Sequence, residues 1–405
     1  MPYKTNRRRI LQGIGAAGVG SALAGCTGDE GVPEESDGME SQEQADNYYG
    51  VEGPFPDGIY GTAWDGWDVP SVGGEFERTT GIEVDIPYMG SNVDGFSSLE
   101  GGADYQFIVP DNIWVSRLGE ADLVQPIDED AFSDILDEIP DWIKNNQTMF
   151  HDGVRYGIPP RWGVAGIIYN SENVSQQEVQ NYSVLWDEEY EDRVTVFDVP
   201  TFSVQMLTLY LEEQGELNLG LADMDREEMT DAVYGAVEDH YNELEQAASD
   251  LFDNCRLLAG TTAEMNRPLL EGEVDVAGGF MLTYAQMKEI EQGLGQDRLE
   301  FEPTPGLGGL FWVEGMAITQ NAETEAELNG VQAFMRWTLS EEGQARLAWT
   351  DDRKSAPTNT AAHQHLNEFQ RDLLHVDEGR EIFENSLDYM PTRVDQWTEL
   401  WEDAK

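Results

Sequence analysis

Hydrophobic and polar residues follow two alternating patterns along most of the chain, from about residue 58 onwards. Short apolar runs bounded by glycine, proline or acidic residues predict strands; they lie at residues 59–64, 82–86, 105–110, 193–197, 273–277 and 308–318. Stretches with helical spacing of apolar residues predict helices; they lie at residues 69–80, 204–214, 225–254, 325–339 and 341–349, with a further helix carrying Trp114, Val115 and Leu118. Strands that alternate with helices are typical of α/β domains with a largely parallel sheet.

One apolar stretch, residues 156–170, differs from the others. The pair Pro159-Pro160 and several glycines interrupt it, and proline is rarely found inside a sheet because it cannot donate a ladder hydrogen bond. We interpret this stretch as a connector between domains. The chain of 405 residues is longer than a single hydrophobic core usually supports, which also favours two domains.

The first 26 residues have the pattern of a secretory signal. Arg7-Arg8 precedes an apolar run at 13–24, and Leu23-Ala24-Gly25-Cys26 follows; a basic flank, an apolar run and small residues at a cleavage site are typical of such signals. The run is shorter than the ~20 residues that cross a bilayer. The arginine pair resembles a twin-arginine signal. The segment Leu23-Ala24-Gly25-Cys26 resembles a lipobox, so we expect lipidation of Cys26.

Two further features of the N-terminal region bear on export. Residues 13–18 spell the dinucleotide-binding pattern G-x-G-x-x-G, but they lack the preceding strand and the later acid that this motif requires. Residues 27–56 are polar and acidic, which predicts a disordered tether. The rest of the chain is therefore expected outside the cell, attached by lipid alone to the outer face of the cytoplasmic membrane, at the cell surface or in the periplasm.

Acidic residues are in large excess. The chain has 80 acidic and 23 basic residues, giving a net charge of −57, and the acids are spread over the whole body rather than gathered in a tail. This composition is typical of halophilic proteins, which work in concentrated salt where ions screen the self-repulsion. Nucleic-acid binding is disfavoured, since few basic groups exist to neutralise phosphates.

The sequence predicts no metal or other cofactor. With Cys26 assigned to lipid, Cys255 is left as a single thiol, more typical of a buried residue than of a nucleophile. His363 and His365 lack the cysteines or matching acid of a metal site.

Aromatic and acidic residues follow two of the predicted strands. Trp64-Asp65-Gly66-Trp67 comes after the first strand, and Asp111 comes after the strand at 105–110. Ligands bind at the carboxyl ends of strands in α/β sheets, so these residues could form one rim. Packing in the core remains an equal alternative for each tryptophan. For any single acid in so acidic a chain, solvent exposure remains the better interpretation. For Arg161, a structural ion pair is the better interpretation.

The order of these segments resembles the extracellular solute-binding proteins of ABC importers, and within them the spermidine/putrescine-binding family. The segments that carry the resemblance are 64–81, 108–110, 157–163, 185–190, 272–274, 308–312 and 356–359. The resemblance implies an α/β fold of two lobes (type II) with a ligand cleft between them. Two crossover strands would join the lobes, which close by hinge motion. The expected first lobe is 57–163 with 280–320, and the expected second lobe is 164–279 with 321–405.

The same resemblance implies an aromatic box around the ligand and carboxylates at its ends. The aromatic residues in matching segments are Trp64, Trp67, Trp162, Phe280 and Trp312, and the acids that could replace the family's carboxylates are Asp65, Asp111, Asp198 and Glu314. A cation over an indole gains about 0.5–2 kcal/mol, and a buried ammonium needs a paired acid. The family's second-lobe acids would fall near Val199, Phe202 and Leu282, none of which can hold an amine.

These observations predict a monomeric receptor, without catalysis or cofactor, that captures a small solute and delivers it to ABC permease and ATPase subunits. A polyamine-like cation is the expected ligand; a sugar, an amino acid, a metal complex or an anion are the alternatives. An exported carboxylate-dependent hydrolase, such as a glycosidase, is the main alternative function, although no nucleophile motif or distinct acid pair supports it. A surface adhesive or structural protein would not need cleft aromatics.

Overall fold

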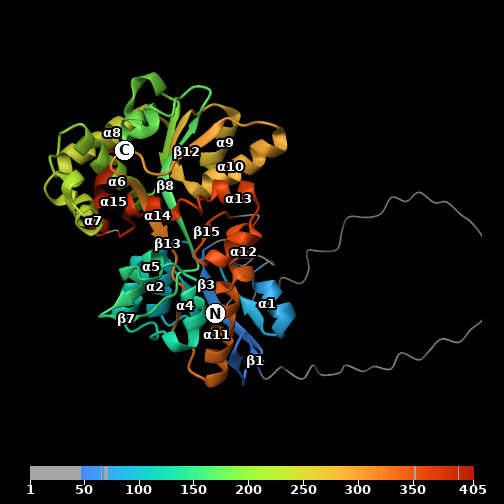
Figure 1. Cartoon of the computed structure of the whole chain (residues 1–405). Coiled ribbons are helices and arrows are strands. Elements are labelled where there is room, and N and C mark those ends of the chain that lie inside the picture. Colours follow the sequence, from blue (N-terminus) through green and yellow to red (C-terminus); the bar gives the residue numbers. More distant parts are fainter. Residues whose placement is uncertain (1–46, 65, 68–71, 351–352, 391) are drawn as a thin grey trace, which may run out of the picture. The chain divides into compact units, whose positions relative to one another are not determined.

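The computed structural model describes residues 47–64, 66–67, 72–350, 353–390 and 392–405. The signal, Cys26, most of the expected tether and Asp65 lie outside these residues. Residues 44–405 form one compact unit, whose path is drawn in Figure 1. No helix in the described part of the chain has the length and apolar character needed to cross a membrane.

A four-stranded sheet organises the part that we call the first lobe. Its strands are, in spatial order, β14 (Ala317–Ile318), β5 (Phe107–Val109), β3 (Gly58–Ala63) and β4 (Glu83–Asp85). β3 pairs in parallel with β4 and β5, and β14 is antiparallel to β5. The helices of this lobe are α1 (Gly73–Thr80), α2 (Asn92–Glu100), α3 (Ile113–Glu120), α4 (Ser133–Asp137), α5 (Asp141–Lys144), α11 (Glu325–Leu339) and α12 (Glu341–Ala348).

An eight-stranded sheet organises the second lobe. Its main order is β10 (Cys255–Ala259), β9 (Val194–Phe197), β11 (Val276–Phe280), β8 (Arg161–Asn170), β13 (Gly309–Val313) and β16 (Ser386–Asp388); β12 (Leu299–Glu302) and β15 (Ala356–Pro357) also pair with β8. β8 is antiparallel to β11, β12, β13 and β15. The sheet is therefore mixed, where the sequence pattern predicted a largely parallel one.

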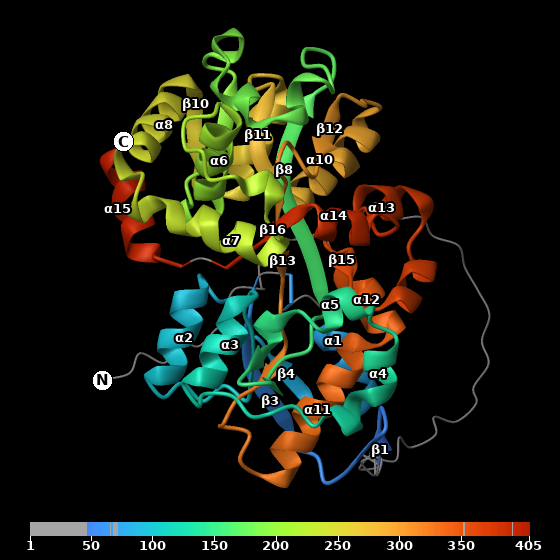
Figure 2. The same ribbon diagram turned by 60° about the vertical axis from the view of Figure 1, so that its left-hand side comes forward.

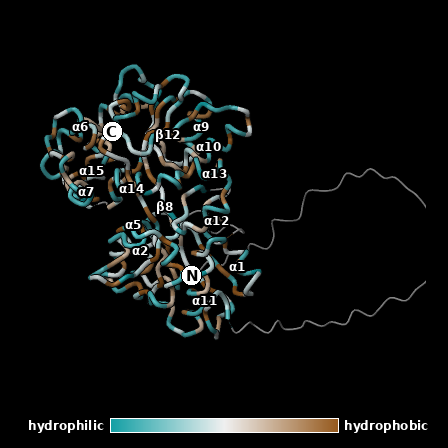
Figure 3. Tube along the Cα trace, in the orientation of Figure 1, coloured by the Kyte–Doolittle hydropathy of each residue, from teal (hydrophilic) through white to brown (hydrophobic). Residues whose placement is uncertain are grey.

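Helices surround this larger sheet (Figure 2). They are α6 (Pro200–Glu213), α7 (Arg226–Gly235), α8 (Tyr241–Asn254), α9 (Thr262–Glu271), α10 (Met281–Leu294), α13 (Glu368–Leu373), α14 (Gly379–Glu384) and α15 (Val394–Asp403). Pro200 begins α6, where its missing N–H costs nothing. The amphipathic α15 buries Trp397 and Trp401, and Figure 3 shows hydrophobic positions along the interior strands.

Two antiparallel segments connect the sheets. β8 and β13 pair in the larger sheet with Trp162 opposite Val313. Ile158 then bridges Met316, and Glu314 bridges Asp111 beside the smaller sheet. All ten residues of β8 are buried, so the connector predicted at 156–170 is also a central strand. The chain passes between the lobes at these two crossover segments and again between α12 and α13, where β15 pairs with β8.

The lobe boundaries differ from those expected in two places. α10 and β12 lie against β8, although 280–320 was assigned to the first lobe. α11 packs on β3, although 321–405 was assigned to the second. Both segments are amphipathic helical or strand patterns that fit either sheet, so only the tertiary packing decides which sheet buries them.

The end of the expected tether is packed on the body. β1 (Asn47–Tyr48) and β2 (Val51–Glu52) form a hairpin, and a second short hairpin joins β6 (Phe150–His151) and β7 (Val154–Arg155). The ring of Tyr49 stacks on Phe76, and its carbonyl accepts a hydrogen bond from Arg336 at 2.5 Å. The prediction of disorder up to residue 56 is therefore wrong for this segment, because aromatic residues near its end find a core to pack against.

Candidate functional site

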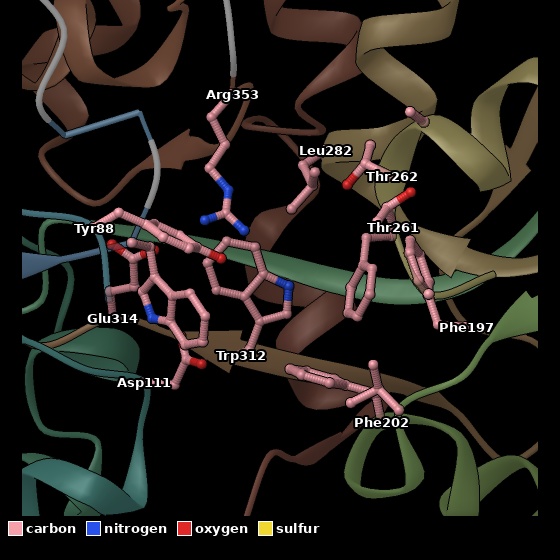
Figure 4. Close-up of a pocket in the computed structure, with 15 residues that line it drawn as sticks. Tyr88, Asp111, Phe197, Phe202, Thr261, Thr262, Leu282, Trp312, Glu314 and Arg353 are labelled. Atoms are coloured by element: carbon pink, nitrogen blue, oxygen red, sulfur yellow. The ribbon is translucent and has the colours of Figure 1, made fainter. Parts of the chain in front are cut away.

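A cavity of about 450 Å³ lies between the two lobes (Figure 4). The first lobe, the crossover segment and the loop before β15 contribute Trp64, Tyr88, Asp111, Glu314 and Arg353, and the second lobe contributes Phe197, Val199, Phe202, Gly260, Thr261, Thr262, Ala263, Phe280, Leu282 and Trp312. Most of these residues come directly after, or at the end of, β3, β5, β9, β10 and β11. The cavity therefore has the position that ligands take in α/β sheets, at the carboxyl ends of strands.

Asp111 is the carboxylate on the first-lobe wall, two residues after β5. It is 6% exposed; its Oδ2 accepts from Nδ2 of Asn92 at 3.0 Å, and its backbone N–H donates to Oδ1 of Asn92 at 2.9 Å. Burial, and then the negative charge of Glu314, raise the pKa of Asp111 to about 7. The carboxyl group is thus held in place and is only partly ionised at neutral pH, because burial outweighs the lowering effect of Asn92, Arg353 and Arg161 on its pKa.

Glu314 lies beside Asp111 and is paired with Arg161. Nε and Nη2 of Arg161 donate to its two oxygens, each at 2.7 Å, and Nε1 of Trp67 donates to Oε2 at 2.9 Å. Arg161 and Glu314 are 0% and 1% exposed. A buried bidentate ion pair fixes both side chains. The pair of Arg161 and Glu314 therefore joins the two crossover segments, and its Glu314 side faces the cavity.

Two indoles with unbonded N–H groups form part of the wall. Trp64 and Trp312 line the cavity, and neither Nε1 atom has a hydrogen-bond partner. The guanidinium carbon of Arg353 lies 5.8 Å from the centre of the Trp64 ring. Trp312 is 5% exposed and lies over Gly163, where a Cβ atom would come within 2.3 Å of the indole. Glycine at 163 is therefore required for Trp312 to occupy this position.

The second-lobe wall is a cluster of phenyl rings. The centroid of Phe280 lies 5.1 Å from that of Phe197 and 4.8 Å from that of Phe202. Phe202 also stacks on Tyr389, with 4.4 Å between centroids. Edge-to-face and stacked pairs of this kind stabilise one another beyond their buried area, which makes this wall a preformed apolar surface.

Five of the residues that the sequence proposed for the site line this cavity. They are Trp64, Asp111, Phe280, Trp312 and Glu314. Asp65 lies outside the described residues. Asp198 points away, because its Oδ1 accepts from Nε1 of Trp401 at 2.8 Å and pairs with Lys405 at 2.8 Å.

Trp67 and Trp162 are packed in the core instead of lining the cavity. Trp67 is fully buried against Arg161 and Glu314, and Trp162 stacks on Phe311 with 5.3 Å between centroids. Trp312 is opposite Gly163 in the β8–β13 ladder. Since successive side chains of a strand point to opposite faces, Trp162 projects from the other side of the sheet.

Several lining residues were not proposed from the sequence. Tyr88, Phe197, Thr261, Thr262 and Arg353 line the cavity, and the first four lie at or after the ends of strands β4, β9 and β10. For Tyr88 and Phe197, the position relative to the predicted strands at 82–86 and 193–197 is the signal that could have found them; Thr261 and Thr262 follow β10, which the sequence pattern did not predict. Val199, Phe202 and Leu282, where the resemblance placed the family's acids, are also on the wall.

Two further observations concern metal-binding and nucleophilic side chains in the described part of the chain. Within the described ranges, no three His, Cys, Asp or Glu side chains are grouped closely enough to hold a metal ion. Burial raises the pKa of the Cys255 thiol to about 12, so it is protonated at neutral pH and is a poor nucleophile.

Comparisons with known proteins agree with the fold. The profile of the family described as "Bacterial extracellular solute-binding protein" matches residues 74–375. The spermidine/putrescine-binding periplasmic protein of Escherichia coli is 24% identical over 269 residues, which cover 66% of this chain and 69% of that protein.

Solved structures show the same two-lobed architecture. A spermidine/putrescine ABC transporter substrate-binding protein from Streptococcus pneumoniae superposes with a TM-score of 0.64 at 18% identity, over 86% of this chain and 100% of that one. A lipoprotein of Treponema pallidum gives 0.63 at 18% identity, over 86% and 99% of the two chains. These likenesses show that the fold is that of the periplasmic binding proteins.

Proposed function

The chain belongs to the bacterial extracellular solute-binding protein family, and from this we propose that it captures a small amine between its lobes and delivers it to the permease of an ABC importer. The relatives named for spermidine and putrescine support an amine as the ligand. The observation that carries the proposal is one cavity, at strand ends of both lobes, that combines a buried carboxylate, Asp111, with the indoles of Trp64 and Trp312.

The chemistry of the first-lobe wall suits an ammonium group. Asp111 is buried beside a second carboxylate, and its pKa is raised although the charges of Arg353 and Arg161 act to lower it, so a bound cation would add positive charge to a carboxyl that these arginines compensate only in part. A cation over the face of Trp64 or Trp312 would gain about 0.5–2 kcal/mol, in competition at Trp64 with Arg353, whose guanidinium carbon lies 5.8 Å from the centre of that ring. Closure of the lobes around the amine would then present a changed surface to the permease.

Amine affinity should rise with pH. The Asp111 carboxyl, with its pKa of about 7, is largely protonated in the empty cavity at pH 6, whereas an alkylamine keeps its proton up to about pH 9–10. Binding below pH 7 therefore requires loss of the carboxyl proton, and we expect the dissociation constant to fall by about tenfold between pH 6 and pH 8. Isothermal titration at fixed high salt, in two buffers of different ionisation enthalpy, measures both the affinity and the proton release. A flat profile would contradict the assignment of Asp111.

Changes at the two lining indoles should weaken amine binding without loss of fold. Trp64→Ala and Trp312→Ala each remove a ring from the cavity wall, and we expect the dissociation constant to rise by about 10-fold or more in each case. Trp186→Phe is the matched control, because Trp186 stacks on Tyr210 outside the cavity. Equilibrium titration of all three proteins tests this; equal losses in the control would point to an indirect effect on the fold.

Export and anchoring complete the proposal. The twin-arginine pair and Cys26 support export of the chain and its lipid attachment at the outer face of the membrane. The even acidity supports a protein adapted to concentrated salt. We infer that the chain is a monomeric binding protein and not an enzyme. The hydrolase alternative is weakened because Glu314, the other carboxylate among the described lining residues, is held at both oxygens by Arg161.

The test of the proposed function is a ligand panel on the purified protein. Thermal unfolding is measured with amines, sugars, amino acids and metal complexes, and each compound that raises the midpoint is titrated. Stabilisation by amines alone supports the proposal, since a ligand that binds only the folded state raises the midpoint. Stabilisation by another class alone, or turnover of a glycoside, would refute it.

A further inference from the structure

Among the described residues, the second-lobe wall of the cavity has no ionisable side chain. All residues from 161 to 302 are described, and those that line the cavity are phenylalanine, valine, leucine, threonine, glycine and alanine, with Trp312 from β13. Phe197, Phe202 and Phe280 form the ring cluster described above, and Val199 and Leu282 extend it. The only carboxylates on the cavity wall in the described part of the chain are therefore those near the first lobe, Asp111 and Glu314.

The polar groups of this wall cannot act as counter-charges for an ammonium group. Thr261 and Thr262 offer neutral hydroxyls. The Nε1–H of Trp312 is a donor without an acceptor, and Figure 4 shows it turned toward the side of the cavity where Thr261 and Thr262 lie. A donor of this kind repels a second donor such as an ammonium and favours an acceptor or the face of an aromatic ring.

The backbone of the same wall is slightly electropositive. Residues 260–263 line the cavity and include the N-cap and first turn of α9, where the helix dipole leaves a partial positive charge. The acids close in sequence already have partners and do not line the cavity: Glu264 accepts from the backbone N–H of Gly260 at 2.9 Å, and Asp198 is held by Trp401 and Lys405. A cation against this wall would meet no carboxylate among the described lining residues of the second lobe.

We propose that the cavity selects a monoamine with an apolar, preferably aromatic, body over diamines and polyamines. The inference rests on the proposed function and narrows its substrate class. The ammonium lies at Asp111 between the indoles, and the body of the ligand lies against Phe197, Phe202 and Phe280. A second ammonium at that end would be buried without a carboxylate, which costs more free energy than the remaining contacts return.

Matched ligand pairs test this selectivity in the purified protein. Hexylamine and 1,6-diaminohexane have the same chain length and differ by one ammonium group; 2-phenylethylamine and spermidine extend the comparison. We expect hexylamine to bind at least about 10-fold more tightly than 1,6-diaminohexane, with 2-phenylethylamine tighter still. Equal or tighter binding of the diamine or of spermidine would overturn the inference and leave the proposed function intact. Binding of no amine at all would overturn both.

A charge placed on the second-lobe wall should reverse the preference. Leu282 lines the cavity in the first turn of α10, where an acid is compatible with the helix. We expect Leu282→Asp to bind 1,6-diaminohexane about 10-fold more tightly than hexylamine. Leu282→Asn is the matched control, since it adds polarity without charge and should not favour the diamine.

A second variant guards against a local effect at position 282. Val199 is the N-cap of α6 and makes no capping hydrogen bond, so aspartate is well tolerated there; Val199→Asp should also shift the preference toward the diamine. Diamine preference in the unchanged protein, or no shift in either folded variant, would contradict the assignment of this wall.

Discussion

Replacing Asp111 by asparagine should raise the dissociation constant of an amine ligand by about 100-fold, the largest effect expected of any change in the cavity. Asparagine has nearly the same shape and can still accept from Asn92, whose amide contacts Oδ2 of Asp111 at 3.0 Å. The variant therefore removes the negative charge while it keeps the geometry. The loss should appear in titrations of hexylamine at pH 8, where the wild-type carboxyl is ionised, and should be smaller at pH 6.

The stability of the empty Asp111→Asn protein provides the control. The pKa of Asp111 is raised by folding to about 7, so its contribution to stability is fully present below its unfolded pKa of about 4 and is lost as pH rises through 7. Asparagine does not ionise, so the variant does not lose this contribution to stability as the pH rises. Its free energy of unfolding, measured by urea denaturation without ligand, should match or exceed that of the wild type at pH 8. Weak binding together with lower stability at pH 8 would indicate a structural role for Asp111.

The second large effect is expected from the ion pair between the crossover segments. Arg161→Met leaves Glu314 buried at 1% exposure with only Trp67 to donate to it, and we expect a loss of about 3–5 kcal/mol in the free energy of unfolding. The physical reason is that the desolvated carboxylate loses its bidentate partner. The midpoint of urea unfolding, followed by tryptophan fluorescence, measures this loss.

A double variant distinguishes the ion pair from simple packing. In Arg161→Met with Glu314→Gln, no charge is left without a partner and the amide of residue 314 still accepts from Trp67, so most of the lost stability should return. Additive losses in the two single variants and the double variant would mean that the pair contributes through packing alone. The result also decides whether the two crossover segments depend on this pair for their alignment.

Much of the fold follows from local patterns in the sequence. Several elements lie where the periodicity predicts them, because an apolar run or an amphipathic stretch indicates which of its side chains are buried. They are the strands at 58–63, 107–109 and 194–197 and the helices at 226–235, 241–254 and 325–339. The strand at 255–259 was missed, because Cys255 and Arg256 interrupt its apolar pattern. Fold and family were both accessible from the order of these segments.

Local sequence patterns did not determine which of the proposed site residues line the cavity. The sequence by itself determined that aromatic and acidic residues follow the strands, and hence that Trp64 and Asp111 could share a rim. Only the tertiary structure decided that Trp312 faces the cavity while Trp162 packs on Phe311 in the core. It likewise brought Arg353 and Leu282, distant in sequence, to the same opening. The face on which a side chain emerges depends on the register between β8 and β13, and register is a relation between distant segments that no local pattern contains.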